Sequence, residues 1–492
     1  MSTRNEYENC ELEGLPTAFF LTNRQNFIKN LKEHLTELPS NSYLFLMGGK
    51  ELFKYDNDDD YHYFLQESNF YYLTGVREFN YYATINLKDA SFSLYIPQPT
   101  EREKIFLHVE TLEEIAAKYQ CNAYDFMKMP QEVNRLNPNK LYVLNGINSD
   151  SGNKILTCDY TFPSPYEKLN EAIDHDSLIY EILADTRTKK SLKEINLISY
   201  LNQITVEGHL QAMKKIYKNF VIEKKNIIER DVENYFYSYT RNKSYCRNHP
   251  YPHICGCGPN GAILDYQQND TPLKDGQLIL MDMGIRAGGY VTDVTSTVPV
   301  NGTFTQKQKE IYNIVLDANL SIQKTAKIGI NWRDMHLLAE KIIVTGLQKL
   351  GLLSSNYDID EMVKNRVCYY FLPCGVGHLM GIDVHDVGGY LSFTPERSKE
   401  KGLKSLRTAR ILENNMILTV EPGIYFIQFL LEMGYKDETV GKYFVQDKLK
   451  EYYEFGGVRI EDDVLINEDG CTNLTSGLPR TTDEIEKAMK EE

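Results

Sequence analysis

Apolar side chains follow two different periods in the first 180 or so residues of the chain. Residues 42–49, 81–87 and 91–97 are rich in β-branched and aromatic side chains, which is typical of strands. Residues 24–35 repeat their apolar side chains at helical intervals. This alternation of short strands with a helix predicts an α/β domain that has a core of its own.

The character of the sequence changes near residue 185. The run ADTRTKKSLKEIN is polar and basic, and Ser191 and Glu194 have the S-x-x-E spacing of a helix capping box. They predict a long helix that ends at about Tyr217. We therefore place a domain boundary at residue 184, with residues 1–184 as the first domain and residues 185–492 as the second.

Carboxylates interrupt the apolar pattern early in the second domain. Residues 281–300 read MDMGIRAGGYVTDVTSTVPV, which predicts two apolar strands joined by a Gly-rich turn. Each predicted strand carries an aspartate in its middle, Asp282 in one and Asp293 in the other. A buried, unpaired carboxylate costs several kcal/mol, so either a positive group lies nearby or these side chains face water.

Three further stretches place ionisable side chains among apolar residues and glycines. GVGHLMGIDVHDVGG contains His378 and His385, ILTVEPGIYF contains Glu421, and GGVRIEDDVLI contains Arg459 and Glu461. Residues two apart in a strand share a face, so Arg459 and Glu461 point to the same side. The two histidines are seven positions apart, and this odd separation would put them on opposite faces of a regular strand, so the chain must bend between them if both are to reach one site.

Each of these residues taken singly has an ordinary structural explanation, such as a strand edge, a hydrogen-bonded histidine or a Glu-Pro-Gly turn. Together they are four carboxylates and one imidazole near predicted strand ends of one domain. This set suits two divalent ions of the Mn or Zn type, about 3.5–4 Å apart, because a single ion would not need four carboxylates. The candidate metal ligands are Asp282, Asp293, His378, Glu421 and Glu461.

The order Asp–Asp–His–Glu–Glu, in the contexts MDMG, TDVTST, GHLMGIDVHDVGG, TVEPGIYF and GGVRIEDD, resembles the pita-bread metallopeptidases. Within them the chain most resembles the prolidase (Xaa-Pro dipeptidase) family, because LKSLRTARIL is close to a run typical of that family. FLQESNFYYLTGV resembles the N-terminal domain shared with aminopeptidase P, and ADTRTKKSLKEI resembles the start of the catalytic domain. The resemblance implies an α/β N-terminal domain and an α+β pita-bread catalytic domain, in which helices cover a curved antiparallel sheet.

The resemblance also implies which residues hold metal. In the family the matching residues bind two divalent ions, for which manganese is expected and zinc or cobalt are alternatives. Asp282 would chelate one ion. His378 and Glu421 would hold the other ion. Asp293 and Glu461 would bridge both ions.

Further roles follow from the same resemblance. Glu421 would also carry a proton from the attacking water to the leaving nitrogen, and His385 would stabilise the developing oxyanion. Arg407 would bind the free carboxylate of a dipeptide through a bidentate contact. Arg459 would orient neighbouring carboxylates. An ordinary ion pair is the alternative explanation for both arginines.

One position departs from the family pattern. The family carries a histidine, within an H-Y dipeptide, about twenty residues before the first metal-binding aspartate. The stretch AILDYQQND has Asp265 at that position. An ionised aspartate only accepts hydrogen bonds, so it would repel a substrate carboxylate and attract an amine. We include Asp265 among the candidate substrate-binding residues, and His253 lies upstream as a candidate substitute for the missing histidine.

Three functions stay open from the sequence. The first is a dinuclear metal-dependent exopeptidase that hydrolyses the Xaa-Pro bond of dipeptides. The second is an Xaa-Pro aminopeptidase that acts on longer peptides. The third is a catalytically impaired peptidase-fold binding protein, because Asp265 replaces the family histidine. Short proline-containing peptides are the expected partners, and the family implies a homodimer.

The composition limits the expected partners and the expected location of the protein. The net charge is −15, from 69 acidic and 54 basic residues, and no long basic run occurs, so nucleic acids and anionic membranes are poor partners. We expect neither a transmembrane helix nor a secretory signal, because no long apolar run is present. The nine cysteines are then expected to be reduced thiols in the cytoplasm. The acidic run at 56–60 lacks the glycine of an EF-hand and predicts a solvated loop.

Overall fold

The computed structural model describes residues 6–55 and 63–491, and the acidic run at 56–60 lies outside them. The described residues form two compact units. The N-terminal unit is Gly14–Arg187, and the C-terminal unit joins the residues up to Glu13 with Thr188–Glu492. The domain boundary at residue 184 stays a prediction from the sequence.

The N-terminal unit is built on a mixed sheet. Its helices are α2 (Thr17–His34), α3 (Ser68–Thr74), α4 (Glu103–Phe106), α5 (Leu112–Tyr119), α6 (Met129–Leu136) and α7 (Ser177–Thr188). Its strands are β1 (Ser42–Met47), β2 (Tyr82–Asn86), β3 (Phe92–Ile96), β4 (Asn122–Asp125), β5 (Lys140–Tyr142) and β6 (Ile173–Asp174). The six strands lie in the order β4-β3-β2-β1-β5-β6. Strands β1, β2 and β3 are the three that the sequence predicts.

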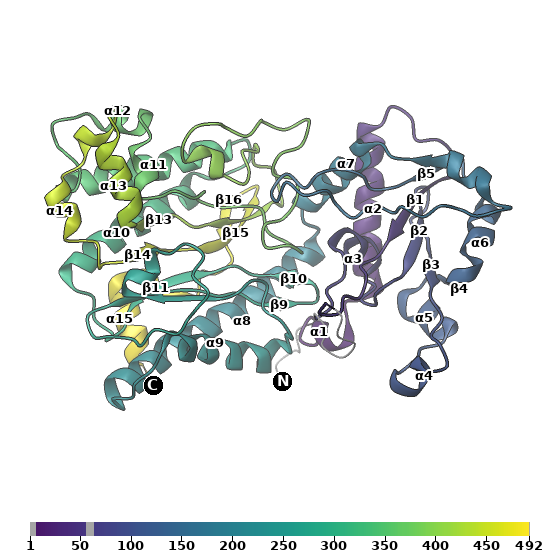
Figure 1. The fold of residues 1–492 in the computed structure, drawn as a ribbon, viewed down its shortest axis with the longest axis horizontal. Coiled ribbons are helices and arrows are strands. Elements are labelled where there is room, and N and C mark those ends of the chain that lie inside the picture. The colour runs from purple at the N-terminus through teal and green to yellow at the C-terminus, as the bar shows by residue number, and fades with distance from the viewer. Residues whose placement is uncertain (1–5, 56–62, 492) are drawn as a thin grey trace. The chain divides into compact units, whose positions relative to one another are not determined.

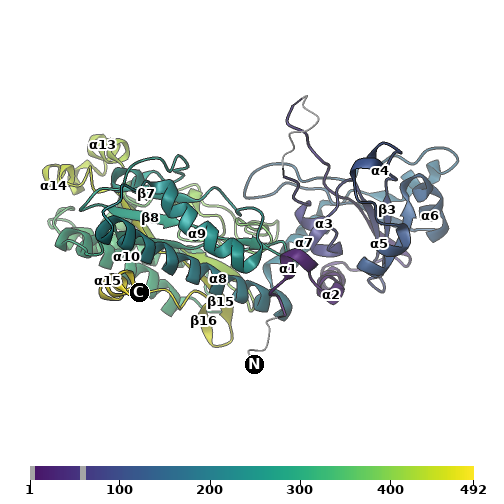
Figure 2. The same ribbon diagram turned by 90° about the horizontal axis from the view of Figure 1, so that it is seen from below.

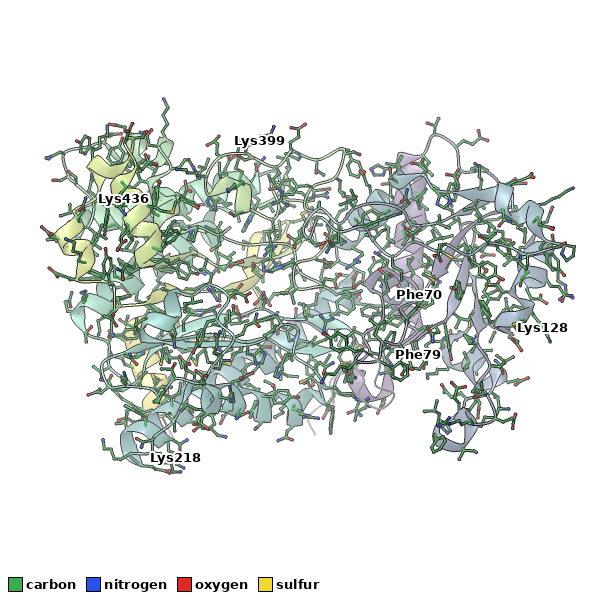
Figure 3. The ribbon with its side chains drawn as sticks, in the orientation of Figure 1. Phe70, Phe79, Lys128, Lys218, Lys399 and Lys436 are labelled. Atoms are coloured by element: carbon green, nitrogen blue, oxygen red, sulfur yellow. The ribbon has the colours of Figure 1, made fainter. Side chains whose placement is uncertain are left out.

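Helices cover both faces of this sheet. Helices α2 and α7 lie on one side of it, and α5 and α6 lie on the other (Figures 1 and 2). Phe70 is fully buried in this unit, whereas Lys128 is exposed at its surface (Figure 3). Successive strand side chains point to opposite faces, and β1 is buried along its whole length because both faces are covered.

The C-terminal unit contains four small antiparallel sheets and most of the long helices. Its helices are α1 (Cys10–Glu13), α8 (Leu192–Ile216), α9 (Glu229–Ser244), α10 (Gln306–Thr325), α11 (Trp332–Lys349), α12 (Ile359–Lys364), α13 (Gln428–Lys436), α14 (Gln446–Lys450) and α15 (Thr482–Lys490). Its strands are β7 (Ile254–Cys257), β8 (Leu278–Asp282), β9 (Arg286–Ala287), β10 (Tyr290–Val291), β11 (Thr295–Pro299), β12 (Ile417–Val420), β13 (Gly423–Tyr425), β14 (Gly457–Arg459), β15 (Asp462–Asn467) and β16 (Gly470–Asn473).

The strands of this unit pair as four separate sheets. One sheet has the order β11-β8-β7 and another has β12-β15-β16, while β9 pairs with β10 and β13 with β14. Helix α8 packs along α9, and α10 packs along α11 (Figure 1). Helix α9 contacts β7, and α10 contacts β12, β13 and β14. Within the described part of the chain, no helix combines the length and the apolar character needed to cross a membrane.

The predicted capping box begins helix α8. The Ser191 hydroxyl accepts a hydrogen bond from the Glu194 amide at 3.3 Å, and the Glu194 carboxylate accepts one from the Ser191 amide at 2.7 Å. Two amide groups that the first helical turn leaves without partners are thereby satisfied. The helix ends at Ile216 and continues as a π-helical turn, so its predicted end near Tyr217 is confirmed.

The predicted hairpin of residues 281–300 is interrupted. Asp282 is the last residue of β8, opposite Thr295 of β11, and Asp293 lies between β10 and β11. The prediction that each aspartate sits in the middle of a strand was therefore wrong. The two arms stay hydrogen-bonded across this interruption, because the Met283 amide donates to the Val294 carbonyl oxygen at 3.0 Å and the Thr292 amide donates to the Ile285 carbonyl oxygen at 3.0 Å. The register is the same on both sides of the interruption, with Asp282 opposite Thr295 and Ala287 opposite Tyr290, so Asp282 and Asp293 face the same side.

The capping box gives a stability prediction. We expect Ser191→Ala to lower the free energy of unfolding of the C-terminal unit by about 1 kcal/mol, because the Glu194 amide loses its acceptor. Urea denaturation followed by circular dichroism measures this difference. Ser238→Ala, at an exposed position inside α9, is the matched control and should leave the free energy of unfolding unchanged or slightly raised. Equal values for the two variants would contradict the role of the cap.

Candidate metal centre

One cavity in the C-terminal unit brings the predicted site residues together. It has a volume of about 620 Å³. Apart from His253, every residue that the sequence singled out for metal or substrate lines this cavity, although these residues are spread over nearly 200 positions. These residues are Asp265, Asp282, Asp293, His378, His385, Arg407, Glu421, Arg459 and Glu461.

His378 is fixed by its backbone and its ring. Its Nδ1 lies 3.0 Å from the Leu379 carbonyl oxygen, so this nitrogen donates and Nε2 faces the carboxylates. Nε2 lies 3.3 Å from the Asp293 carboxylate and 3.5 Å from that of Glu421. Burial by itself lowers the pKa of His378, but the two carboxylates outweigh burial and raise the pKa to about 9. A proton therefore occupies the position between imidazole and carboxylates that a metal ion would take.

The bend predicted between the two histidines is confirmed. The ring centroids of His378 and His385 lie 4.5 Å apart with the ring planes nearly perpendicular. The amide of Gly381, between them, donates to the Asp383 carbonyl oxygen at 3.1 Å. Both imidazoles thus reach the same cavity despite their odd separation in sequence.

Arg459 anchors one side of the cluster. Its Nη2 donates to the Asp282 carboxylate at 2.6 Å, its Nε to the Thr295 hydroxyl at 2.9 Å and its Nη1 to the Tyr425 hydroxyl at 2.9 Å. Burial raises the pKa of Asp282 to about 7 even though the guanidinium charge opposes this rise. Among the described residues, the second carboxylate oxygen of Asp282 has no hydrogen-bond partner.

Glu461 lies beside Asp293. The Thr295 hydroxyl donates to the Glu461 carboxylate at 2.7 Å. One ligand atom from each of Asp293, His378 and Glu461 lies within 4.8 Å of the other two, and all three residues are buried. Burial, followed by repulsion from Asp293, raises the pKa of Glu461 well above its ordinary value.

The charges of the cluster fit divalent cations. Four carboxylates face the Arg459 guanidinium and the His378 imidazole, so negative charge is in excess. Burial raises the pKa of three of them, Asp282, Glu421 and Glu461, because their charged forms are unfavourable where no cation compensates them. Oxygen ligands with one imidazole suit ions such as Mn²⁺ or Zn²⁺. The unpartnered oxygen of Asp282 is a further ligand atom that such an ion would satisfy.

Substrate candidates lie around this cluster. Asp265 is exposed at the cavity wall, and Gln267 donates to its carboxylate at 3.0 Å. Arg407 lines the same cavity, and its charge acts to lower the pKa of Glu421. His253 is absent from the described residues that line the cavity. Its Nε2 lies 2.8 Å from the Gly284 carbonyl oxygen, so His253 does not take the place of the missing histidine.

Sequence reasoning missed several residues of the site. Thr295 could have been found, because it stands two residues after Asp293 and turns to the same carboxylates. Tyr251 and Cys374 line the cavity from the runs HPYPH and FLPCGVG, which have no diagnostic spacing. Burial raises the pKa of Cys374 to about 12, so its thiol stays protonated beside Glu421.

Comparison with known sequences gives matches to both halves of the chain. Residues 196–468 match metallopeptidase family M24, and residues 20–143 match the aminopeptidase P N-terminal domain. An Xaa-Pro dipeptidase from Rattus norvegicus is 36% identical over 481 residues, which cover 96% of this chain and 94% of that protein. A probable Xaa-Pro aminopeptidase from Phaeosphaeria nodorum is 33% identical and covers 91% of each chain.

Comparison with solved structures gives the same result. The aminopeptidase PepP of Pseudomonas aeruginosa superimposes with a TM-score of 0.74 at 26% identity, covering 96% of this chain and 98% of that one. A histidine-to-alanine variant of Escherichia coli aminopeptidase P gives a TM-score of 0.76 at 27% identity with the same coverage. These likenesses confirm the predicted fold class, an α/β N-terminal domain followed by an α+β pita-bread domain.

The raised pKa values predict that metal binding releases protons. Asp282, with a pKa of about 7, and His378, with a pKa of about 9, must both lose a proton to act as ligands. We expect the affinity for Mn²⁺ to rise between pH 6 and pH 9 by about tenfold per pH unit for each proton displaced.

Titration calorimetry in two buffers of different ionisation enthalpy counts the released protons. The count should be higher at pH 6.5 than at pH 9.5, and His378→Asn should lower it. An affinity that stays constant from pH 6 to pH 9 would contradict the protonation of the metal-free cluster.

Proposed function

The chain belongs to metallopeptidase family M24, and from this premise we propose that it hydrolyses the peptide bond before proline, with dipeptides as the preferred substrates. The observation that carries the proposal is the convergence of the five candidate metal ligands in one cavity that also contains Arg407. Relatives named Xaa-Pro dipeptidase that align over nearly the whole chain support the choice of substrate.

We propose two divalent ions, with manganese first and zinc or cobalt as alternatives. Asp282 would hold one ion. His378 and Glu421 would hold the other. Asp293 and Glu461 would bind both. When bound, such ions lower the pKa of a water molecule and polarise the scissile carbonyl group.

Glu421 moves the proton in this proposal. Its carboxylate is held by a hydrogen bond from the Thr419 hydroxyl at 3.2 Å, and burial raises its pKa. A carboxyl group with a raised pKa can accept a proton from the attacking water and deliver it to the nitrogen of the leaving proline. His385, beside His378, donates to the carbonyl oxygen as negative charge develops on it. Arg459 keeps Asp282 in position through their ion pair.

Arg407 and Asp265 recognise the two ends of a dipeptide. Both line the cavity that contains the carboxylate cluster. A dipeptide carries one carboxylate and one ammonium group within a short span. Arg407 binds the carboxylate, for which the guanidinium geometry is suited, and Asp265 attracts the ammonium group. The missing histidine is thereby replaced by a charge that selects a free amine.

Asp265 also favours a second candidate function, an aminopeptidase for longer Xaa-Pro peptides. A free amine is common to dipeptides and longer peptides, whereas only a dipeptide places a carboxylate beside Arg407. The catalytically impaired alternative rests on the same replacement of the family histidine by Asp265. The homodimer and the cytoplasmic location stay predictions from the sequence.

The direct test is proline release from Gly-Pro by the Mn²⁺-loaded protein. We expect release that a chelator abolishes and that added Mn²⁺ restores, because Asp282, Glu421 and Glu461 act only with cations. Asp265→His is assayed alongside. Activity of the natural chain establishes the dipeptidase.

The variant separates the alternatives. Activity only in Asp265→His would mean that the ion cluster works and that the substrate site has diverged, so peptides such as Gly-Pro-Leu follow. Binding of Mn²⁺ without any hydrolysis by either protein would overturn the proposal in favour of the binding protein.

Arg407 gives a second functional prediction. Arg407→Ala should raise KM for Gly-Pro about 10- to 100-fold, because a charge-assisted contact to the substrate carboxylate is lost. Arg407→Lys keeps the charge but not the bidentate geometry, so its KM should lie between that of the natural protein and that of Arg407→Ala. Steady-state kinetics on Gly-Pro and on Gly-Pro-Leu measure the effect. Equal losses on both peptides would argue against a role in binding the dipeptide carboxylate.

A further inference from the structure

A second group of potential metal ligands lies outside the cavity. It consists of Glu233 on helix α9, His249 in the following loop and His253 just before strand β7. One ligand atom from each lies within 4.8 Å of the other two. The His249 and His253 rings are in contact, with centroids 4.0 Å apart. We call these three residues the Glu233–His249–His253 cluster.

The hydrogen bonds of His253 leave one of its nitrogens unsatisfied. Nε2 lies 2.8 Å from the Gly284 carbonyl oxygen and 3.1 Å from Nδ1 of His249. A carbonyl oxygen only accepts, so Nε2 carries the hydrogen and Nδ1 presents a lone pair. Nδ1 is buried, and no described residue gives it a hydrogen-bond partner. The orphaned lone pair therefore needs a cation or a proton.

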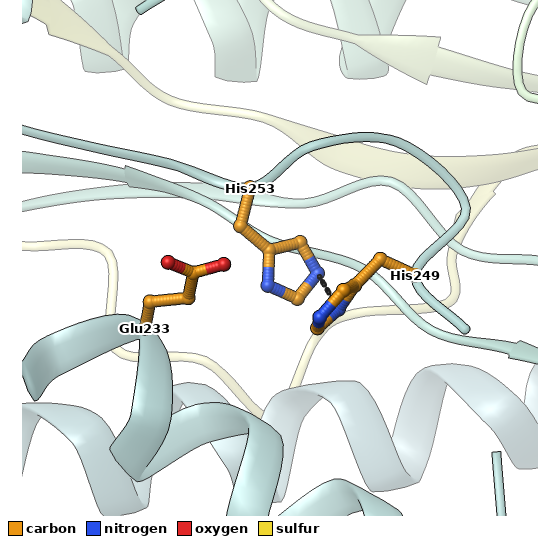
Figure 4. Close-up of side chains that lie close together, drawn as sticks. All are labelled: Glu233, His249 and His253. Atoms are coloured by element: carbon orange, nitrogen blue, oxygen red, sulfur yellow. Dashed lines mark hydrogen bonds between the residues drawn. The ribbon is translucent and has the colours of Figure 1, made fainter. Parts of the chain in front are cut away.

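Glu233 lies on the side of this orphaned nitrogen. Figure 4 shows the Glu233 carboxylate on one side of the His253 ring. His249 lies at the other ring nitrogen, Nε2, to which it is hydrogen-bonded. Two acceptors, a carboxylate and an imidazole lone pair, thus face one another. A metal ion satisfies both acceptors without protonating the ring.

Neighbouring groups orient the proposed ligands through hydrogen bonds, as is usual in metal sites. The Nε2–H group of His253 points to a backbone carbonyl, which fixes the tautomer that leaves Nδ1 for a metal. The Asn269 amide group donates to Glu233 at 3.2 Å and to the His253 carbonyl oxygen at 2.8 Å. Burial and the charge of Arg241 lower the pKa of His249, so this ring is also neutral, the form that binds metal.

We propose that Glu233, His249 and His253 form a further metal site, distinct from the carboxylate cluster, for a divalent transition ion of the zinc type. Two imidazoles and one carboxylate are the ligand set of open zinc sites, with a water in the fourth position. Ligand atoms on one tetrahedral zinc ion lie about 3.3 Å apart, so the half-buried side chains of Glu233 and His249 would move inward when the ion binds. Four carboxylates with one imidazole suit Mn²⁺, whereas this cluster favours a softer ion.

The proposed ion would stabilise one wall of the cavity. Pro250, Tyr251 and Pro252 line the cavity, and His249 and His253 flank them on either side. An ion that joins these two histidines to Glu233 fastens the short segment to helix α9. Gly284, the hydrogen-bond partner of His253, also lies two residues after Asp282. The inferred ion is structural and goes beyond the proposed hydrolysis.

The experiment counts zinc in the whole chain. The natural protein is loaded with Zn²⁺, freed of excess by gel filtration and analysed by atomic absorption. We expect His249→Gln to bind one zinc per chain fewer than the natural protein, with affinity at this site weakened about 100-fold. His175→Gln, at an exposed position in the N-terminal unit, is the matched control and should bind as much as the natural protein.

A further variant keeps the result independent of the carboxylate cluster. Asp293→Asn should lose zinc from the cavity but keep the zinc that depends on His249. Glu233→Gln should behave as His249→Gln does, and zinc should raise the thermal midpoint less in both than in His175→Gln. Equal zinc contents in the natural protein, His249→Gln and Glu233→Gln would overturn the site. Loss of zinc in His175→Gln would overturn it as well.

Peptidase activity plays no part in this test, so the site and the proposed function fail separately. A chain that releases proline from Gly-Pro but binds the same zinc with and without His249 has the function and lacks the site. A chain that loses one zinc in His249→Gln and releases no proline has the site and lacks the function.

Discussion

Repulsion among buried carboxylates is the constraint on which the C-terminal unit depends. Four acidic side chains converge on one cavity, and burial makes each of them unfavourable when charged and unpaired. Arg459 compensates one of them directly, through its ion pair with Asp282. Burial raises the pKa of Glu421 and of Glu461, so the remaining negative charge is unfavourable without a compensating cation. Cations remove the same conflict without neutralising the ligands, so metal binding and stability of this unit are linked.

Strand pairing brings these charges together. The register of β8 on β11 places Asp282 opposite Thr295, whose hydroxyl holds Glu461. The register of β13 on β14 places Gly423 opposite Arg459, just after Glu421 in the chain. A shift of either pairing by one residue would turn these side chains to the opposite face. The hairpin of β8–β11 keeps one register across its interruption, which leaves Asp282 and Asp293 on the same face.

The sequence predicts those parts of the structure that depend on local rules. The capping box of Ser191 and Glu194 and the strands of the N-terminal unit follow from residue types at fixed spacings. The candidate ligands were recognisable because a carboxylate in an apolar run is unfavourable without a reason. Tyr251 and Cys374 could not be found in this way, because a tyrosine or a cysteine in an apolar run needs no special explanation. The position of His253 also required the structure, because the sequence does not show that its ring lies against the Gly284 carbonyl oxygen and outside the lining of the cavity.

The proposed ion ligands and the proposed substrate residue Asp265 differ in burial, and this difference bears on why a change at Asp265 is compatible with an intact carboxylate cluster. Asp293 and Glu461 are buried, and a change at either would leave an uncompensated charge next to the other. Asp265 is exposed, and water screens its charge from the cluster. A substitution there alters which charged group of a substrate is attracted, and it does not disturb the balance of charge around the ions. A substitution at the exposed position 265 therefore costs the fold little, whereas one in the buried cluster leaves a neighbouring charge uncompensated.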